Sequence, residues 1–148
     1  MHDILHKVGA KSSSPQEAFL ALTQLEGLGA WWTNDVKLDD DAGKLIRFTF
    51  GETGFFVMKV LEQVPGKRVE WQVMNGPEDW IGTRISFDIS QTDGYTLVMF
   101  KHAGWAAPSE AMHHCSTKWA MFLMSLKSLL ETGQGSPHPK DVSIDNWN

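Results

Sequence analysis

The stretch SEAMHHCSTKWAMFLMSLKSLLETG, residues 109–133, decides what the rest of the chain can form. Pro108, Ser109 and Glu110 favour a helix start, and Gly133 favours its end. Between them one side of the helical wheel is largely apolar and consists of Met112, Cys115, Ser116, Trp119, Phe122, Leu123, Leu126, Leu129 and Leu130. At ~1.5 Å per residue such a helix is about 36 Å long. We therefore predict an amphipathic helix that crosses the apolar face of a whole sheet.

Before this helix, the period of the apolar residues changes to two. Ile46, Phe48 and Phe50 would point to one side of a strand, with polar residues between them. The same alternation recurs in residues 55–64, 68–74, 83–92 and 95–102, and short turns with Gly or Pro separate these segments. Alternating strands joined by short turns predict an antiparallel sheet with one solvated face. Residues 4–10 are expected to form a further, first strand.

Two short helices are expected directly after the first strand. Ser14 can cap the first helix, and Glu17 can complete a capping box with it. Gly27 and Gly29 interrupt the apolar pattern, which predicts that the helical region is divided in two. The predicted fold class is α+β, with a curved antiparallel sheet wrapped around the long C-terminal helix.

The length of 148 residues suits a single core, and we assign residues 1–135 to one domain. Residues 136–148 form a C-terminal tail, because its first residues, SPHPK, cannot continue a helix or a strand. Ile144 and Trp147 either dock on the body, dock on a second subunit, or belong to a frayed end.

Composition excludes several classes of protein. The single cysteine, Cys115, rules out an intramolecular disulfide and favours a reducing, cytoplasmic location. A formal net charge of −5 argues against nucleic acid and anionic membranes as partners. No apolar run is long enough to span a bilayer as a helix.

We find no cofactor motif, metal site or catalytic set in the sequence. The string Gly27-Leu28-Gly29 lacks the third glycine and the preceding strand of a dinucleotide-binding loop. His113 and His114 are adjacent on the helix, so their side chains diverge by about 100° and are expected to be exposed. Cys115 lies in the apolar stripe, where it is expected to be an inert, buried thiol.

The 7 tryptophans are the strongest indication of a binding site. Rings of this size either interdigitate into a filled core or hold sheet and helix apart around an apolar cavity. We favour the cavity, which would suit a small molecule. His102 continues the register of Val98 and Phe100, so it is either a satisfied core histidine or a polar group that faces the cavity.

Four stretches stand in a characteristic order: WIGTRISF (80–87), TLVMFKHAGW (96–105), CSTKW (115–119) and LKSLLETG (126–133). Together with Trp31 and Trp32 they resemble the SRPBCC superfamily, in particular its branch related to the activator of the heat-shock chaperone ATPase. The resemblance implies a helix-grip, START-like fold with a deep hydrophobic cavity between sheet and C-terminal helix. It implies uses that range over lipid or polyketide binding, cyclase or hydrolase chemistry and chaperone activation, with no fixed catalytic residues.

We therefore predict non-enzymatic binding of a small hydrophobic or aromatic molecule. The predicted binding residues are Trp32, Phe48, Phe50, Trp71, Phe87, Phe100, Trp119 and Phe122, with His102 as the polar group. Two alternatives stay open: a cyclase- or hydrolase-type enzyme in which His102 moves a proton, and an interaction module similar to a chaperone activator. Exposed Met121 and Met124, with Trp147, would supply the apolar patch of such a module or of a homodimer.

Overall fold

The computed structural model describes residues 1–148. The strands are β1 (His2–Lys11), β2 (Asp35–Leu38), β3 (Leu45–Thr49), β4 (Phe55–Val64), β5 (Arg68–Asn75), β6 (Arg84–Thr92) and β7 (Tyr95–Trp105). The helices are α1 (Pro15–Thr23), α2 (Leu25–Trp31) and α3 (Glu110–Thr132), with one 3₁₀ turn, η1 (Glu78–Trp80).

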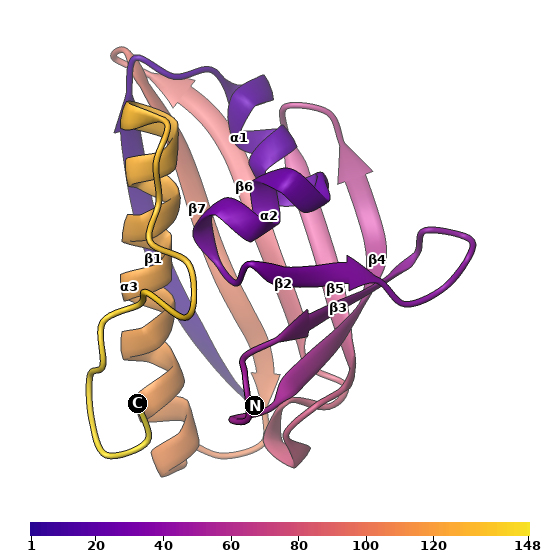
Figure 1. Cartoon of the computed structure of the whole chain (residues 1–148). Helices are drawn as coiled ribbons and strands as arrows, with labels where there is room; N and C mark the ends of the chain where they lie inside the picture. Colours follow the sequence, from indigo (N-terminus) through magenta and orange to yellow (C-terminus); the bar gives the residue numbers. More distant parts are fainter.

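All strands belong to one antiparallel sheet in the order β1-β7-β6-β5-β4-β3-β2. The sheet curves around α3, while α1 and α2 lie beside one end of that helix (Figure 1). The first strand is tied to α3 by Lys127, whose Nζ donates to the carbonyl of Gly9 at 2.6 Å. These features confirm the predicted α+β helix-grip fold.

Strand β2 was not predicted from the sequence. Its four residues are mostly exposed, so they lack the alternation that reveals a half-buried strand. It forms because β3 offers it an open edge, with Val36 opposite Phe48.

The helical region divides at a different residue from the predicted one. Gly27 and Gly29 both lie inside α2, and the break falls at Gln24, whose backbone is extended. Gly27 allows close packing instead, since a Cβ there would lie 2.6 Å from the Cα of Ala21 in α1. The predicted capping box is present: Ser14 Oγ accepts from Glu17 N at 3.1 Å, and Glu17 Oε1 accepts from Ser14 N at 3.2 Å.

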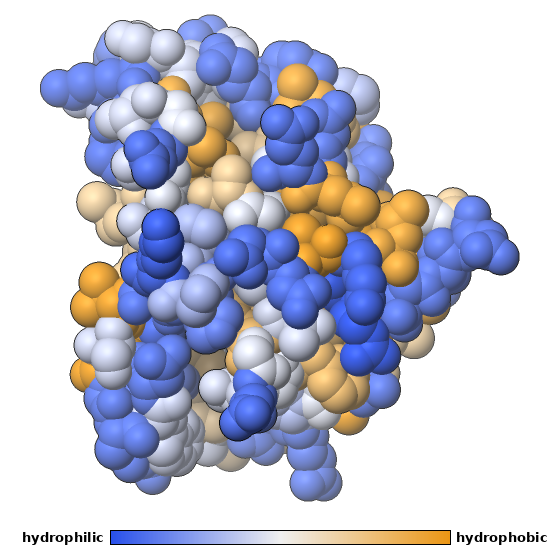
Figure 2. Space-filling view, in the orientation of Figure 1, coloured by the Kyte–Doolittle hydropathy of each residue, from blue (hydrophilic) through white to orange (hydrophobic).

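The face seen in Figure 2 is mostly hydrophilic, with apolar surface gathered near β2 and the N-terminal end of α2. Leu38 of β2 contributes to the exposed apolar surface of the molecule. Met124 is also exposed, whereas Met121 is partly buried and packs against the core, which corrects its predicted exposure. A long, unbranched methionine side chain can bend back toward apolar neighbours. None of the helices combines the length and apolar character needed to cross a membrane.

Candidate functional site

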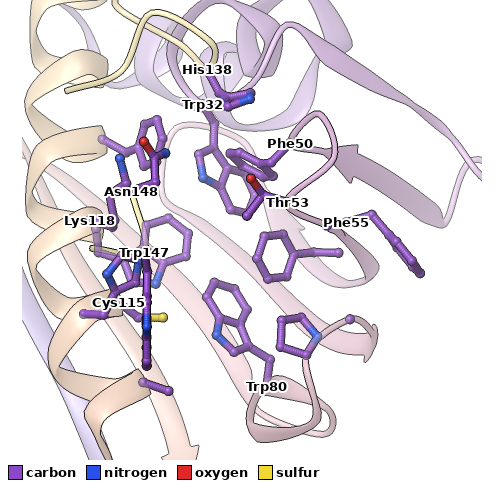
Figure 3. A pocket seen from close by; sticks show the side chains of 18 of the residues that line it. Trp32, Phe50, Thr53, Phe55, Trp80, Cys115, Lys118, His138, Trp147 and Asn148 are labelled. Carbon is purple, nitrogen blue, oxygen red and sulfur yellow. The ribbon is translucent and has the colours of Figure 1, made fainter. Parts of the chain in front are cut away.

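A cavity of about 530 Å³ lies between the N-terminal half of α3, the β3–β4 turn, the segment 76–80 and the C-terminal tail. Figure 3 shows its two sides, with Cys115 and Lys118 projecting from α3 and Phe50 and Thr53 facing them from the β3–β4 turn. The aromatic residues that line it are Trp32, Phe50, Phe55, Phe56, Trp80, Trp119, Phe122 and Trp147. Its volume falls within the usual range for sites that enclose a small molecule.

The aromatic rings of the wall contact one another and form a continuous lining. Phe56 stacks on Trp80 with ring centroids 4.1 Å apart, and Trp32 lies 5.0 Å from Trp119. Phe50 meets Phe122 edge to face at 6.1 Å, which joins the β3–β4 side to α3. These mutual contacts hold the rings in place, so the apolar wall exists before any ligand binds.

The C-terminal tail, residues 136–148, forms the remaining wall and docks on the body of the same chain. Backbone hydrogen bonds attach it to the segment after α2, because His138 N donates to Trp32 O at 2.8 Å and Asn34 N donates to His138 O at 3.2 Å. On the other side, Ser136 N donates to Ser125 Oγ of α3 at 2.7 Å. The tail therefore bridges α2 and α3 across the cavity.

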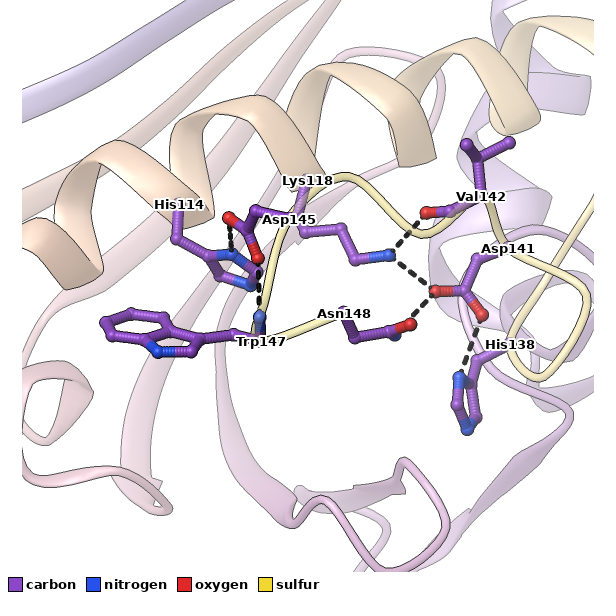
Figure 4. Close-up of polar contacts among 8 residues, drawn as sticks. All are labelled: His114, Lys118, His138, Asp141, Val142, Asp145, Trp147 and Asn148. Atoms are coloured by element: carbon purple, nitrogen blue, oxygen red, sulfur yellow. Dashed lines mark hydrogen bonds and ion pairs between the residues drawn. The ribbon is translucent and has the colours of Figure 1, made fainter.

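The strongest polar contact of the tail is an ion pair with α3 (Figure 4). Lys118 Nζ lies 2.6 Å from Asp141 Oδ2 and donates to Val142 O at 2.8 Å, while His138 Nδ1 lies 2.8 Å from Asp141 Oδ1. Burial by itself would raise the pKa of Asp141. The hydrogen bonds from Lys118 and His138 and the charge of Lys118 outweigh burial and hold that pKa below its usual value.

His114 makes a second, more exposed contact between α3 and the tail. Its Nδ1 lies 2.6 Å from Asp145 Oδ2, and the ring of Trp147 covers it at a centroid distance of 5.3 Å. The hydrogen bond from His114 is the main reason that the pKa of Asp145 is lowered. His113 is exposed as predicted, but His114 is half-buried, because the docked tail covers its side of the helix.

Cys115 faces the cavity, yet its chemistry is unfavourable for a nucleophile. Burial raises the pKa of its thiol to about 11, and the negative charges of Asp79 and Asp145 add to the effect. A thiol with so high a pKa is almost fully protonated at neutral pH, and the thiolate is the reactive form.

His102 is completely buried and does not line the cavity. Trp119 Nε1–H donates to its Nδ1 at 3.1 Å, so Nε2 carries the ring proton and donates to Thr83 Oγ1 at 2.8 Å. The Thr83 hydroxyl in turn donates to the carbonyl of Trp80. Burial lowers the pKa of His102 to about 3, so the ring is neutral at physiological pH. The geometry makes His102 a residue that positions Trp119 and Trp80, both of which line the cavity.

The structure divides the predicted binding residues into two groups. Trp32, Phe50, Trp119 and Phe122 line the cavity. Phe48, Trp71, Phe87, Phe100 and His102 lie in the packed core, away from the cavity lining. All of these side chains lie between the sheet and α3, and the hydrophobic periodicity of strands and helix does not separate a filled region of that space from a hollow one.

Sequence reasoning missed much of the cavity wall. Phe56 and Trp80 belong to it, and so do Lys118 and the tail residues Asp141 and Trp147. Trp80 could have been predicted as part of a wall, since a large ring directly after the loop 75–79 has to pack against other residues. The place where the tail residues dock could not be predicted, because an irregular segment has no periodic pattern.

Comparison with known proteins identifies the family. The model of the family described as Activator of Hsp90 ATPase homolog 1-like protein matches residues 12–131. No curated protein matches the chain.

Solved structures agree with this assignment. The Aha1 dimer from Colwellia psychrerythraea, solved in solution, is 41% identical, with a TM-score of 0.80 over 91% of this chain and 100% of that chain. Protein MLL2253 from Mesorhizobium loti is 18% identical, with a TM-score of 0.73 over 87% of this chain and 96% of that one. DynU16, from the dynemicin biosynthetic locus, is 17% identical, with a TM-score of 0.72 over 90% of this chain and 48% of that one.

The two more distant structures share the fold alone. The family model matches most of the chain, and the Colwellia structure is similar to nearly all of it. These two comparisons therefore show the family as well as the fold. The chain belongs to the family of Activator of Hsp90 ATPase homolog 1-like proteins, within the SRPBCC group of folds.

Proposed function

We propose that this protein binds a small aromatic or hydrophobic molecule, without converting it, in the cavity between α3, the β3–β4 turn and the tail. The observation that carries the proposal is the aromatic lining of a cavity of about 530 Å³. Sites of this kind bury most of a ligand in apolar walls and orient it with a few polar groups. Thr53, Asp79 and Asn148 are the polar residues that supply such groups here.

The chemistry of His102 and Cys115 supports binding rather than catalysis by these two residues. His102 is neutral, fully hydrogen-bonded and separated from the cavity by Trp119 and Trp80. Cys115 is protonated at neutral pH. Neither residue is suited to general acid–base or nucleophilic chemistry, which needs a group that can change its protonation state at working pH.

A pair of variants tests the proposal. Ala111 lines the cavity, and Ala111→Trp would occupy part of it, whereas Ala42→Trp makes the same substitution in the exposed β2–β3 turn, which does not line it. We expect flavonoids, polyketides and fatty acids, titrated by calorimetry, to include at least one ligand that binds the wild type and Ala42→Trp equally and Ala111→Trp at least tenfold more weakly. Equal binding to both variants would place the ligand elsewhere, and silence across the panel would refute the proposal.

We also propose that the chain forms a homodimer, on the support of the Colwellia relative, whose structure is described as a dimer. Met124 and Trp147 are 54% and 45% exposed and offer apolar surface for contact with a second copy or with a chaperone partner. Sedimentation analysis should give a mass of two chains. The mass of one chain at all concentrations would rule the dimer out.

A further inference from the structure

The cavity lining carries more negative than positive charge, and this difference limits which ligands can bind. The lining residues with a full charge at neutral pH are Asp79, Lys118 and Asp141. No arginine lines the cavity, and a further carboxylate, Asp145, lies directly behind His114.

Lys118 is not available to a ligand. Its ammonium group is bound to Asp141 Oδ2 at 2.6 Å and to Val142 O at 2.8 Å, and its side chain is only 12% exposed. The same group lies 5.4 Å from the centre of the Phe122 ring. A carboxylate or phosphate on a ligand would have to displace Asp141, which is itself buried and bonded to His138 and Asn148.

Asp79 is in the opposite situation. Its carboxylate forms no ion pair and no side-chain hydrogen bond, and the residue is exposed at the edge of the cavity. Because Lys118 and Asp141 neutralise each other, Asp79 leaves the cavity with an excess of negative charge. The two histidines of the lining, His114 and His138, each face a carboxylate of the tail rather than Asp79.

The aromatic walls act in the same direction. The face of an aromatic ring is the negative region of its quadrupole, tryptophan attracts cations more strongly than other rings do, and the lining includes the partly exposed Trp147. The cavity is partly closed off from bulk water by the tail, which weakens solvent screening of such contacts. Lys118 above Phe122 already shows a cation in contact with this wall.

The negative charges of Asp79 and Asp145 also act on Cys115, which lines the cavity. Burial is the main cause of the raised pKa of its thiol, the hydrogen bond with Trp80 acts against it, and the two carboxylates add to it. Burial opposes a charge of either sign, whereas the two carboxylates favour a cation over an anion.

We propose that the cavity selects organic cations with a flat aromatic body over neutral or anionic molecules of the same shape. This inference rests on the proposed binding function and narrows it to a class of ligand. The ring stacks between the aromatic side chains, and its positive charge lies toward Asp79 at the edge of the cavity.

Three probes of nearly equal shape test it: N-methylquinolinium, 2-methylnaphthalene and 2-naphthoate. We expect calorimetric titration of the full chain at low salt to show the cation binding about tenfold more tightly than the neutral probe, and the anion most weakly. If the neutral probe or the anion binds as tightly as the cation, the charge preference is wrong while the binding function stands. If none of the three binds, both proposals fail.

A matched pair of variants tests whether Asp79 is the source of the preference for cations. Asp79→Asn removes the unpaired charge at the cavity, and Asp41→Asn removes an equal charge from the β2–β3 turn, which does not line it. We expect Asp79→Asn to weaken N-methylquinolinium binding about threefold to fivefold at low salt and to leave 2-methylnaphthalene unchanged. Asp41→Asn should change neither. A loss of equal size in both variants would mean that the overall charge of the chain, rather than the cavity, attracts the cation.

Discussion

The space between the sheet and α3 is filled at one end and hollow at the other. At the filled end α1 and α2 lie beside the C-terminal half of α3, and Leu22, Trp31 and Leu126 are fully buried (Figure 1). At the hollow end the N-terminal half of α3 faces the sheet without a second helix, and only η1, the β3–β4 turn and the tail close the space.

Ring size does not explain the difference, because both ends contain large rings. Trp71 and Phe87 pack edge to face at 5.1 Å and do not line the cavity. Trp80 and Phe56 stack even more closely, at 4.1 Å, but they line the open space. The comparison shows that the extent of the α1–α2 layer decides where the molecule is hollow.

The first prediction contrasts a tryptophan at each end. Trp31 is fully buried and donates from Nε1 to Ala21 O at 2.8 Å, so Trp31→Ala should lower the free energy of unfolding by about 4 kcal/mol. Trp80→Ala should cost about half as much, because its ring already borders empty space. Urea denaturation measures both losses. Trp31→Phe, which keeps a ring, should fall between wild type and Trp31→Ala; equal losses for Trp31→Ala and Trp80→Ala would contradict the division into two ends.

The second prediction concerns His102, which lies behind the cavity wall and is hydrogen-bonded to Trp119 and Thr83. Its pKa is lowered to about 3 in the folded state, and an unfolded histidine has a pKa of about 6.5. Protons therefore bind the unfolded state first. The stability due to neutral His102 is complete above about pH 6.5 and is lost as the pH falls toward 3, with a loss of about 3 kcal/mol by pH 4.

The carboxylates also lose stability in acid, so the His102 contribution has to be isolated by difference. His102→Gln keeps a polar side chain but cannot take up a proton. We expect its free energy of unfolding, measured in urea at pH 7 and pH 4, to fall by about 3 kcal/mol less than that of the wild type. Parallel pH profiles would show that His102 is not held neutral.

His102 also shows how far the sequence could be interpreted. Its inward direction followed from the alternation with Val98 and Phe100, and the structure agrees. Its partners could not be predicted, since Thr83 precedes β6 and Trp119 lies on α3, 19 and 17 residues away along the chain. The sheet, the two short helices and α3 follow from local periodicity and capping, which depend on neighbouring residues in the chain.

The cavity is harder to predict, because it depends on how far the α1–α2 layer extends and on where the C-terminal tail docks. Phe48 and Phe50 were expected on one strand face, but Phe50 lies just after the end of β3, and only Phe50 reaches the cavity. The tail has no apolar period, and its docking rests on single contacts such as Lys118 with Asp141. Such contacts become visible only when the fold brings residues 118 and 141 together.

The third prediction tests how the tail closes the hollow end. Asp141 and Asp145 both pair with α3, but their side chains are 3% and 34% exposed. Asp141→Asn leaves Lys118 without a counter-charge in a nearly buried position and should lower the free energy of unfolding by about 2 kcal/mol. Asp145→Asn should cost clearly less than Asp141→Asn, since Asp145 is more exposed and water replaces the lost contact. Thermal or urea denaturation compares the two, and equal costs would mean that the tail contacts are equivalent.

The last prediction concerns the smallest changes in the free energy of unfolding, which we expect when a small side chain is enlarged. Ala18 is fully buried at the filled end, and Ala18→Leu has no room, so it should cost about 1–2 kcal/mol. Cys115 faces the cavity, and Cys115→Leu adds apolar atoms to empty space, so the free energy of unfolding should change by less than about 0.5 kcal/mol. Calorimetric titration should then show weaker ligand binding for Cys115→Leu alone, because its new atoms occupy the ligand's volume. If Cys115→Leu destabilised the fold as much as Ala18→Leu, the hollow end would have to be as tightly packed as the filled one.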